Sequence, residues 1–202
     1  MRRLAVFCSG EGTNLQAILE GCRRHRIPAE AVLVVTDTPK AYALRRARRF
    51  GVATVVLVPA DYASKAAYEE ALLHHLKRHR IDYLLLAGFM RILGRRIVRP
   101  YRNRILNIHP ALLPCFKGVH AVRDALRYGV QVTGVTVHLV DEGVDTGPIV
   151  LQESLRIRPG ETEKTLHARI HRVEHRLYPE AIRLLIQKKL RILGRKVQTV
   201  GR

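Results

Sequence analysis

The sequence predicts an α/β fold in which a mostly parallel sheet continues into antiparallel strands and carries helices on both faces. In the first half, short apolar runs alternate with longer stretches of helical periodicity, the pattern of a parallel, doubly wound sheet. In the second half, two strand-like runs follow each other with no helix between them, which favours antiparallel neighbours. No change of composition marks a domain boundary, so residues 1–202 are expected to form a single domain.

The strands of the first half are predicted from continuous apolar runs, which suit strands that are buried on both faces of a parallel sheet. They cover residues 4–8, 31–35, 54–58 and 83–87. The stretches between them place apolar side chains three and four residues apart, as one face of a helix does. These helices are expected over residues 13–26, 41–50 and 64–80.

The second half begins with a predicted strand and a short helix, over residues 104–109 and 121–128. The two antiparallel strands follow, over residues 132–140 and 148–157.

The end of the chain is predicted to be a long helix followed by a hairpin. Thr162 is the expected N-cap of the helix. We expect Pro179 to kink or restart this helix, because proline has no backbone N–H to donate. Within residues 191–200, Gly194 separates two β-prone pieces that are expected to pair as a hairpin.

The charge of the chain is unusual, because 36 basic residues, 28 of them arginine, stand against 17 acidic residues, for a net charge of +19. Such a balance attracts polyanions. The basic residues do not gather in one block, however, and aromatic residues, on which single-stranded bases stack, make up only 5%. We interpret most of the charge as spread over solvated helix faces, and do not favour nucleic acid as a partner.

The three cysteines, Cys8, Cys22 and Cys115, have neither metal-ligand nor disulfide spacing. The apolar run near the N-terminus is far too short to span a membrane, and nothing there resembles a signal peptide. We therefore expect a reduced, cytoplasmic protein with no membrane attachment. It would work as a monomer or a homodimer, a choice that the sequence leaves open.

A glycine-containing turn, SGEGTN at residues 9–14, connects the first predicted strand to the first helix. Ligands collect at this edge of a doubly wound sheet, and the free N–H groups of a helix N-terminus favour phosphate. The glycines, including Gly12, let the backbone approach an anion, and Thr13 and Asn14 add side-chain donors. Leu15 stands where a dinucleotide fingerprint has its third glycine, so a monophosphate is favoured over a nicotinamide cofactor. An ordinary tight turn is the alternative.

The run ILNIHPALLP carries Asn107 and His109, whose side chains point to the same face if the run is a strand. Leu106 and Ile108 then take the opposite, buried face. Pro110 ends the strand directly after His109, which puts the pair at its carboxyl end. A lone histidine on an apolar strand is more often a satisfied core residue, but the strand-end position and the asparagine beside it favour a functional pair.

The asparagine amide can donate to a developing oxyanion, and histidine can stabilise charge or move a proton near neutral pH. Such a histidine needs a carboxylate that orients it or raises its pKa. The candidates in VDEGVDTGP are Asp141, Glu142 and Asp145, of which Asp145 lies in a glycine-flanked turn between two strands. There is no serine or cysteine nucleophile with a matching base and no metal-ligand spacing around His109, so acyl or formyl transfer without a covalent enzyme intermediate fits best.

Five motifs resemble, in order, those of the phosphoribosylglycinamide formyltransferase family: SGEGTNLQAI, AGFMRIL, LNIHPALLP, VTVHLVDEGVDTGPI and RVEHRLYP. The resemblance covers nearly the whole chain. It implies a formyltransferase fold with a Rossmann-like, phosphate-binding half (residues 1–100) and a catalytic and folate-binding half (residues 101–202). It also implies formyl transfer from 10-formyltetrahydrofolate, as a co-substrate, to the amine of glycinamide ribonucleotide in purine biosynthesis, with no metal and no tightly bound cofactor.

The resemblance also implies roles for single residues. Asn107 and protonated His109 would stabilise the oxyanion that forms when the amine attacks the formyl carbon, and Asp145 would hold the histidine charge and relay a proton through water. His138 would support this set, although it is equally a satisfied polar position on an alternating strand. The residues that match the substrate phosphate loop and a nucleotide contact are Gly12, Thr13, Asn14 and Glu174.

The folate pocket is expected where the family has the FMRIL motif and the turn after the first antiparallel strand. The matching residues are Met90, Arg91, Ile92, Leu93 and Val140. Met90 and Ile92 have plain core packing as their alternative. Lys65 stands where some relatives carry arginine near the folate tail, and this departure puts its role in doubt. His120 has no expected chemistry, and we interpret it as structural.

Three alternatives share parts of this pattern. Methionyl-tRNA formyltransferase would carry the same Asn–His–Asp set, but also a further C-terminal domain of about 100 residues and no GEGTN loop. Formyltetrahydrofolate deformylase would carry an additional N-terminal regulatory domain, whereas the first predicted strand here begins at Leu4. A basic nucleic-acid-binding protein predicts salt-dependent binding and leaves the Asn–His–Asp set unexplained.

Overall fold

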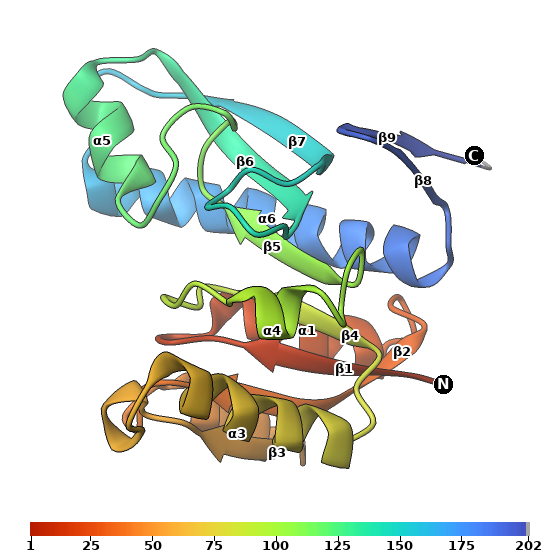
Figure 1. Cartoon of the computed structure of the whole chain (residues 1–202). Coiled ribbons are helices and arrows are strands. Elements are labelled where there is room, and N and C mark those ends of the chain that lie inside the picture. Colours follow the sequence, from red (N-terminus) through yellow and green to blue (C-terminus); the bar gives the residue numbers. More distant parts are fainter. Residues whose placement is uncertain (201–202) are drawn as a thin grey trace.

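The computed structural model describes residues 1–200 and contains a seven-stranded sheet in the order β3-β2-β1-β4-β5-β6-β7 (Figure 1). Its parallel part consists of β1 (Arg2–Phe7), β2 (Ala29–Thr36), β3 (Ala53–Val56), β4 (Tyr83–Leu86) and β5 (Ile105–His109). The antiparallel part consists of β6 (Val132–Leu139), which pairs with β5, and β7 (Ile149–Arg156), which pairs with β6. The predicted α/β fold with a mixed sheet is confirmed.

The central strands are buried on both faces, which is why their sequences are apolar without alternation. In β1, Leu4 and Val6 pack into one core while Ala5 and Phe7 pack into the other, and none of the four has exposed surface. The sheet therefore separates two hydrophobic cores.

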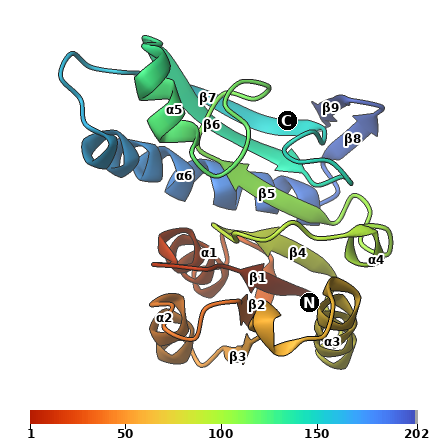
Figure 2. The same ribbon diagram turned by 60° about the vertical axis from the view of Figure 1, so that its left-hand side comes forward.

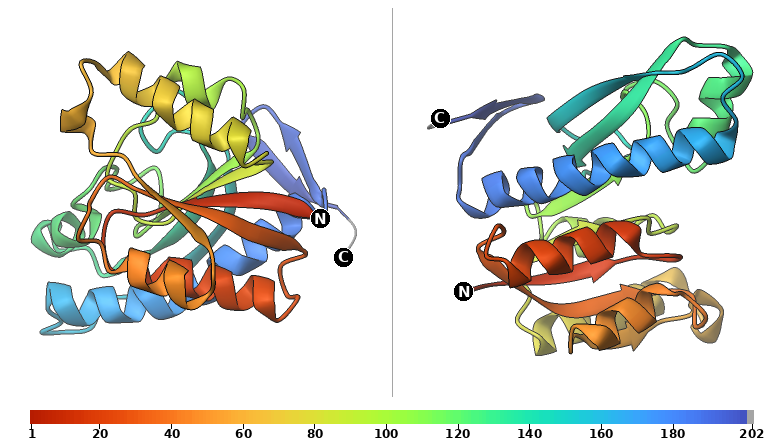
Figure 3. Two further views of the ribbon diagram at one scale, coloured as in Figure 1. Left: turned by 90° about the horizontal axis from the view of Figure 1, so that it is seen from below. Right: turned by 180° about the vertical axis from the view of Figure 1, so that it is seen from behind.

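Helices cover both faces of the sheet (Figure 3). The first core is covered by α1 (Thr13–Arg23), α2 (Ala43–Arg49), α5 (Ala121–Tyr128) and α6 (Glu163–Ile186). The second core is covered by α3 (Lys65–Arg78) and α4 (Arg95–Val98). The sequence pattern does not predict α4 or the 3₁₀ turn η1 (Pro59–Asp61), because neither is long enough to show a helical period.

Two details of the helices differ from expectation. The first helix ends at Arg23 rather than at residue 26, and His25 just beyond it takes a left-handed backbone conformation with φ of 55°. α6 starts at its predicted cap, Thr162, and continues through Pro179. The expected restart is wrong: Tyr178 and Ala181 on either side of the proline are fully buried, so packing holds the helix together across the missing backbone donor.

The strand order places the loop after β1 next to the loop after β4. β1 has β2 on one side and β4 on the other, so the chain leaves β1 and β4 at a switch point where ligands bind in such sheets. The backbone N–H of Ser9 donates to the carbonyl of Gly88 at 2.9 Å, which joins the turn after β1 to the turn after β4.

The chain ends in the predicted hairpin, β8 (Leu190–Leu193) and β9 (Lys196–Thr199), which pair antiparallel. Figure 2 shows this hairpin beyond the end of α6, beside the antiparallel part of the sheet. Within residues 1–200, none of the helices has both the length and the apolar character needed to cross a lipid bilayer.

One buried hydroxyl fastens α6 to the sheet. The hydroxyl oxygen of Tyr178 lies 2.9 Å from the carbonyl oxygens of both Leu86 and Leu106, so its single O–H serves β4 and β5 together. We predict that Tyr178→Phe lowers the free energy of unfolding by about 1–3 kcal/mol, because the buried hydrogen bonding of this hydroxyl to the two carbonyls is lost. Urea denaturation measures this, with exposed Tyr128→Phe as the matched control. Equal stabilities of the two variants would contradict the prediction.

Candidate active site

The carboxyl end of β5 presents two polar side chains on the face that carries α3 and α4. Leu106 and Ile108 of this strand pack into the opposite core, so Asn107 and His109 alternate away from it. In the antiparallel register Asn107 lies directly opposite His138 of β6, and such opposed residues share a face. The three side chains therefore gather over one part of the sheet.

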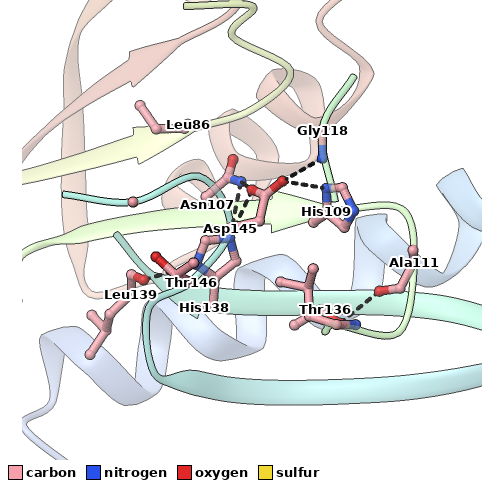
Figure 4. Close-up of polar contacts among 12 residues, drawn as sticks. Leu86, Asn107, His109, Ala111, Gly118, Thr136, His138, Leu139, Asp145 and Thr146 are labelled. Carbon is pink, nitrogen blue, oxygen red and sulfur yellow. Dashed lines mark hydrogen bonds and ion pairs between the residues drawn. The ribbon is translucent and has the colours of Figure 1, made fainter. Parts of the chain in front are cut away.

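Asp145 reaches this group from the loop between β6 and β7 (Figure 4). Its Oδ1 accepts a hydrogen bond from Nδ2 of Asn107 at 3.3 Å. Its Oδ2 lies 3.5 Å from Nδ1 of His109 and accepts a hydrogen bond from the backbone N–H of Gly118 at 2.9 Å. The carboxylate thus contacts both members of the Asn–His pair and the loop that follows them.

The other two carboxylates of the same loop are committed elsewhere. Asp141 accepts hydrogen bonds within the loop, from the hydroxyl of Thr146 at 2.6 Å and the backbone of Gly143 at 3.1 Å. Glu142 pairs with Arg95 of α4 and with Arg99, which directly follows that helix. The choice that the sequence left among three acids is therefore made by geometry in favour of Asp145. Its backbone has a positive φ of 50°, a region that Asp adopts more readily than most residues with a side chain.

The hydrogen bonds define which ring nitrogens carry protons. Nε2 of His109 lies 2.7 Å from the carbonyl of Phe116, which can only accept, so Nε2 carries the proton and Nδ1 faces Asp145. Nδ1 of His138 donates to the carbonyl of Leu139 at 2.8 Å in the same way. Nε2 of His138 is then free to accept from Nδ2 of Asn107 at 3.1 Å. Both N–H groups of the Asn107 amide consequently have acceptors, Asp145 and His138.

Burial and charged neighbours act in opposite directions on the pKa of His109 and on that of Asp145. Burial lowers the pKa of His109 below its ordinary 6.5, although the carboxylate of Asp145 and the carbonyl of Phe116 act in the other direction. For Asp145, burial favours the neutral acid, but the nearby imidazole of His138, the backbone hydrogen bond from Gly118 and the charge of His109 prevail and lower its pKa to about 2. Near pH 7 the free site therefore holds a charged Asp145 beside a neutral His109.

A cavity of about 490 Å³ opens over these residues. Its walls come from the loops after β4, β5 and β6 and from α1 and α6. Most of the residues expected at the site line it: Asn14, Met90, Arg91, Ile92, Leu93, Asn107, His109, His138, Val140, Asp145 and Glu174. Residues from all parts of the chain are thus brought to one cavity.

The loop after β4 forms an apolar wall of this cavity. Met90 and Ile92 are 55% and 60% exposed, so the alternative that they are plain core residues is wrong. Two contacts fix this loop to the rest of the protein. Nε of Arg91 lies 2.7 Å from Oδ2 of the buried Asp37, and the hydroxyl of Ser9 accepts a hydrogen bond from the backbone N–H of Met90. Asp37, which could pass for a ribose-binding acid, is therefore occupied by Arg91.

The opposite end of the cavity is polar and includes a histidine that sequence reasoning missed. Buried Glu174 accepts hydrogen bonds from Nδ2 of Asn14 and Nδ1 of His171, both at 2.8 Å. The hydrogen bond to Glu174 raises the pKa of His171. Oδ1 of Asn14 is buried without a partner among the described residues, so this acceptor is unused in the free site. His171 precedes Glu174 by three residues, and this spacing on one helix face was the available signal.

Three of the expected residues do not line this cavity. Gly12 caps α1 with φ of 69°, and a Cβ there would lie 2.9 Å from the Cβ of Ala43, so the position requires glycine. Thr13, the first residue of α1, borders a smaller neighbouring cavity of about 300 Å³. Lys65 is exposed on the first turn of α3, with its amino group 3.9 Å from Glu69, and a folate-tail role for it stays a prediction. Within residues 1–200, no group of three or more His, Cys, Asp or Glu side chains is arranged to hold a metal.

Comparisons with known proteins agree with the motifs. The family described as "Formyl transferase" matches residues 2–182. Phosphoribosylglycinamide formyltransferase of Bacillus subtilis (strain 168) is 42% identical over 92% of this chain and 95% of its own. Glycinamide ribonucleotide transformylase 1 of Symbiobacterium toebii has a crystal structure that is 48% identical, with a TM-score of 0.97 over 100% of this chain and 95% of that one. Its counterpart from Geobacillus kaustophilus is 50% identical, with a TM-score of 0.89 over 92% and 98% of the two chains.

Fold, site and comparisons together define an enzyme of the formyltransferase class. The chain belongs to the formyl transferase family, and the resemblance seen in its motifs to phosphoribosylglycinamide formyltransferases is confirmed.

The contact between Asp145 and His109 has a measurable consequence in the free protein. We predict that Asp145→Asn lowers the pKa of His109 further, because the carboxylate is the main influence that raises it against burial. NMR titration of the histidine ring carbons measures the shift, and His74, exposed on α3, is the internal control that should not move. An unchanged His109 titration in the variant would show that the two side chains do not interact.

Proposed function

We propose that this enzyme transfers the formyl group of 10-formyltetrahydrofolate to the amine of glycinamide ribonucleotide. The observation that carries the proposal is the meeting of Asn107, His109 and Asp145 between an apolar and a polar end of one cavity. The names and coverage of the relatives support formyl transfer to glycinamide ribonucleotide.

The apolar end suits the pterin of the folate. Met90 and Ile92 present exposed side chains to the cavity, and Val140 and Val144 face it from the loop after β6. Apolar walls with a few directed polar groups are what a flat heterocycle requires. The backbone of Arg91 would supply polar groups here, since its side chain is held by Asp37.

The polar end suits the nucleotide. Asn14 has an unpartnered Oδ1, and the carboxylate of Glu174 lies beside it, so both can accept from ribose hydroxyls or the amine. The phosphate would lie at the N-terminus of α1, where the backbone N–H groups of the first turn have no partner within the helix. Gly12 and Thr13 would contribute there, outside the main cavity.

The reaction needs one proton to move between two nitrogens. The amine nitrogen attacks the formyl carbon, a C–N bond forms and the carbonyl oxygen becomes an oxyanion. The attacking nitrogen then loses a proton, through water beside Asp145, to Nδ1 of His109. Collapse of the intermediate re-forms the carbonyl and breaks the bond to the folate nitrogen, which takes up the proton. Asp145 stabilises the imidazolium while it exists.

Asn107 is proposed to donate to the oxyanion. Both of its amide N–H groups have acceptors in the free site, so the substrate oxygen would replace one of them. The bond to Asp145 is the longer, at 3.3 Å against 3.1 Å for His138, and is the one we expect to be exchanged. Loss of one such donor typically raises a barrier by about 2.7–4 kcal/mol.

The first test is the reaction itself. We predict that purified protein forms formylated product and free tetrahydrofolate in equal amounts when both substrates are present. Folate release without glycinamide ribonucleotide would instead favour a hydrolytic deformylase. No turnover with either combination would overturn the proposed function.

The second test concerns Asp145. We predict that Asp145→Asn keeps the affinity for both ligands but lowers kcat by about 10²-fold or more, since the neutral amide cannot stabilise the imidazolium. Asp141→Asn is the matched control, because it makes the same change within the same loop, away from His109. Steady-state kinetics and ligand titration separate the effects. A near-wild-type rate for Asp145→Asn would remove this residue from the mechanism.

A further inference from the structure

The loop that carries Asp145, residues 140–148, contains no helix or strand of its own. Its two ends are fixed to the sheet, because Val140 donates to the carbonyl of Ile105 at 3.0 Å and Leu139 donates to that of Pro148 at 2.9 Å. Asp145 lies near the far point of the loop in a left-handed conformation, with φ of 50°. Asp145 itself is held over β5 by Asn107 and by Gly118, and the rest of the loop has further contacts on both sides of Asp145.

Arg95 of α4 and Arg99, the residue that caps the C-terminus of that helix, hold the loop at Glu142. Nε of Arg95 lies 2.6 Å from Oε2 of Glu142, and Nε of Arg99 lies 3.1 Å from Oε1. The two arginines are four residues apart, so they lie on the same side of the helical turn, and each contacts a different oxygen of the Glu142 carboxylate. Glu142 is three residues before Asp145, and Figure 2 shows α4 below this loop.

A third arginine holds the loop from the opposite side. Nη1 of Arg195, in the turn between β8 and β9, donates to the carbonyl of Thr146 at 3.0 Å. Thr146 follows Asp145 directly, and its hydroxyl donates to Asp141 within the loop. Asp145 is thus bracketed by a contact to α4 on one side and a contact to the hairpin on the other.

From this arrangement we infer that Arg95, Arg99 and Arg195 are positioning residues that hold the Asp145 loop at its working distance from Asn107 and His109. The inference rests on the proposed function for its kinetic consequence but not for its structural one. The three arginines, called here the loop clamp, touch none of the proposed reacting groups. They act through Glu142 and the backbone of Thr146.

The arginines of the loop clamp lie on the surface, so we expect them to contribute little to the stability of the whole protein. The side chains of Arg95 and Arg99 are 71% and 68% exposed, and exposed ion pairs add little to global stability. Local order is a separate matter, because a loop with few buried contacts opens far more readily than the whole protein. A displacement of Asp145 by about 1 Å would cost up to about 10²-fold in rate.

The test compares two double variants of equal charge. Arg95→Ala with Arg99→Ala removes the α4 half of the clamp. Arg96→Ala with Arg102→Ala removes the same charge from the same region, and neither of these arginines forms an ion pair among the described residues. We expect the clamp variant to lose about tenfold in kcat with little change in KM for the nucleotide, and the control to stay within about twofold of wild type.

A second readout needs no substrate. If Asp145 leaves His109, the pKa of His109 falls, as it does when the carboxylate is removed. NMR titration should therefore show a lower His109 pKa in the clamp variant than in the control. An unchanged titration, or an equal shift in both variants, overturns the inference whatever the kinetics show. If the wild type fails to turn over the nucleotide, the proposed function fails. The titration still tests whether the arginines hold Asp145 beside His109.

A charge reversal tests the contact itself. Glu142→Arg should lower kcat at least as far as the loss of both arginines, since three cations would then meet. Adding Arg95→Glu and Arg99→Glu restores the attraction with reversed signs and should recover most of the rate. No recovery would overturn the assignment to this contact. Arg195→Ala tests the hairpin side in the same way, with Arg191→Ala, an exposed arginine of β8, as its control.

Discussion

The carboxylate of Asp145 carries a negative charge where little water reaches it, since only 11% of its side chain is exposed. Such a charge is stable only when donors surround it. The donors come from two segments, the amide of Asn107 on β5 and the backbone N–H of Gly118 in the loop that follows. The need to satisfy one carboxylate therefore orients the asparagine, whose oxygen would repel it. The bond from Gly118 also fixes its loop, in which the carbonyl of Phe116 accepts a hydrogen bond from Nε2 of His109.

The change of strand direction after β5 is what allows this meeting. Because β6 is antiparallel to β5, the chain leaves β6 beside Ile105, at the amino end of β5. The loop then folds back along β5 until Asp145 lies over Asn107 and His109. The register matters as much as the direction: a slip of one residue would turn Asn107 and His109 into the first core and Leu106 and Ile108 toward the cavity.

Local rules account for much of this site, and their limits are physical. Alternation on a strand and a following proline are sufficient to place Asn107 and His109 together at a strand end. They cannot choose among Asp141, Glu142 and Asp145, because the choice depends on how a nine-residue loop folds over a strand distant in sequence. The contacts of Asp37 with Arg91 and of Glu142 with Arg95 also join residues distant in sequence, so local rules cannot predict them. The fold was predictable because its central strands are continuous apolar runs and its longer helices show a helical period, whereas α4 and η1 are too short to have one.

The lowered pKa values of both His109 and Asp145 fit a site in which the imidazolium forms only during the reaction. The resemblance to the family implied a protonated His109, but burial lowers its pKa and leaves the ring neutral near pH 7, ready to accept a proton. Asp145 is already ionised 3.5 Å away, so the imidazolium, once formed, meets a carboxylate that needs no rearrangement. The stabilisation is then greatest when the proton has moved and smallest before the substrates react. In the proposed mechanism this is the condition for lowering the barrier, since an interaction made equally with bound substrates would not increase kcat.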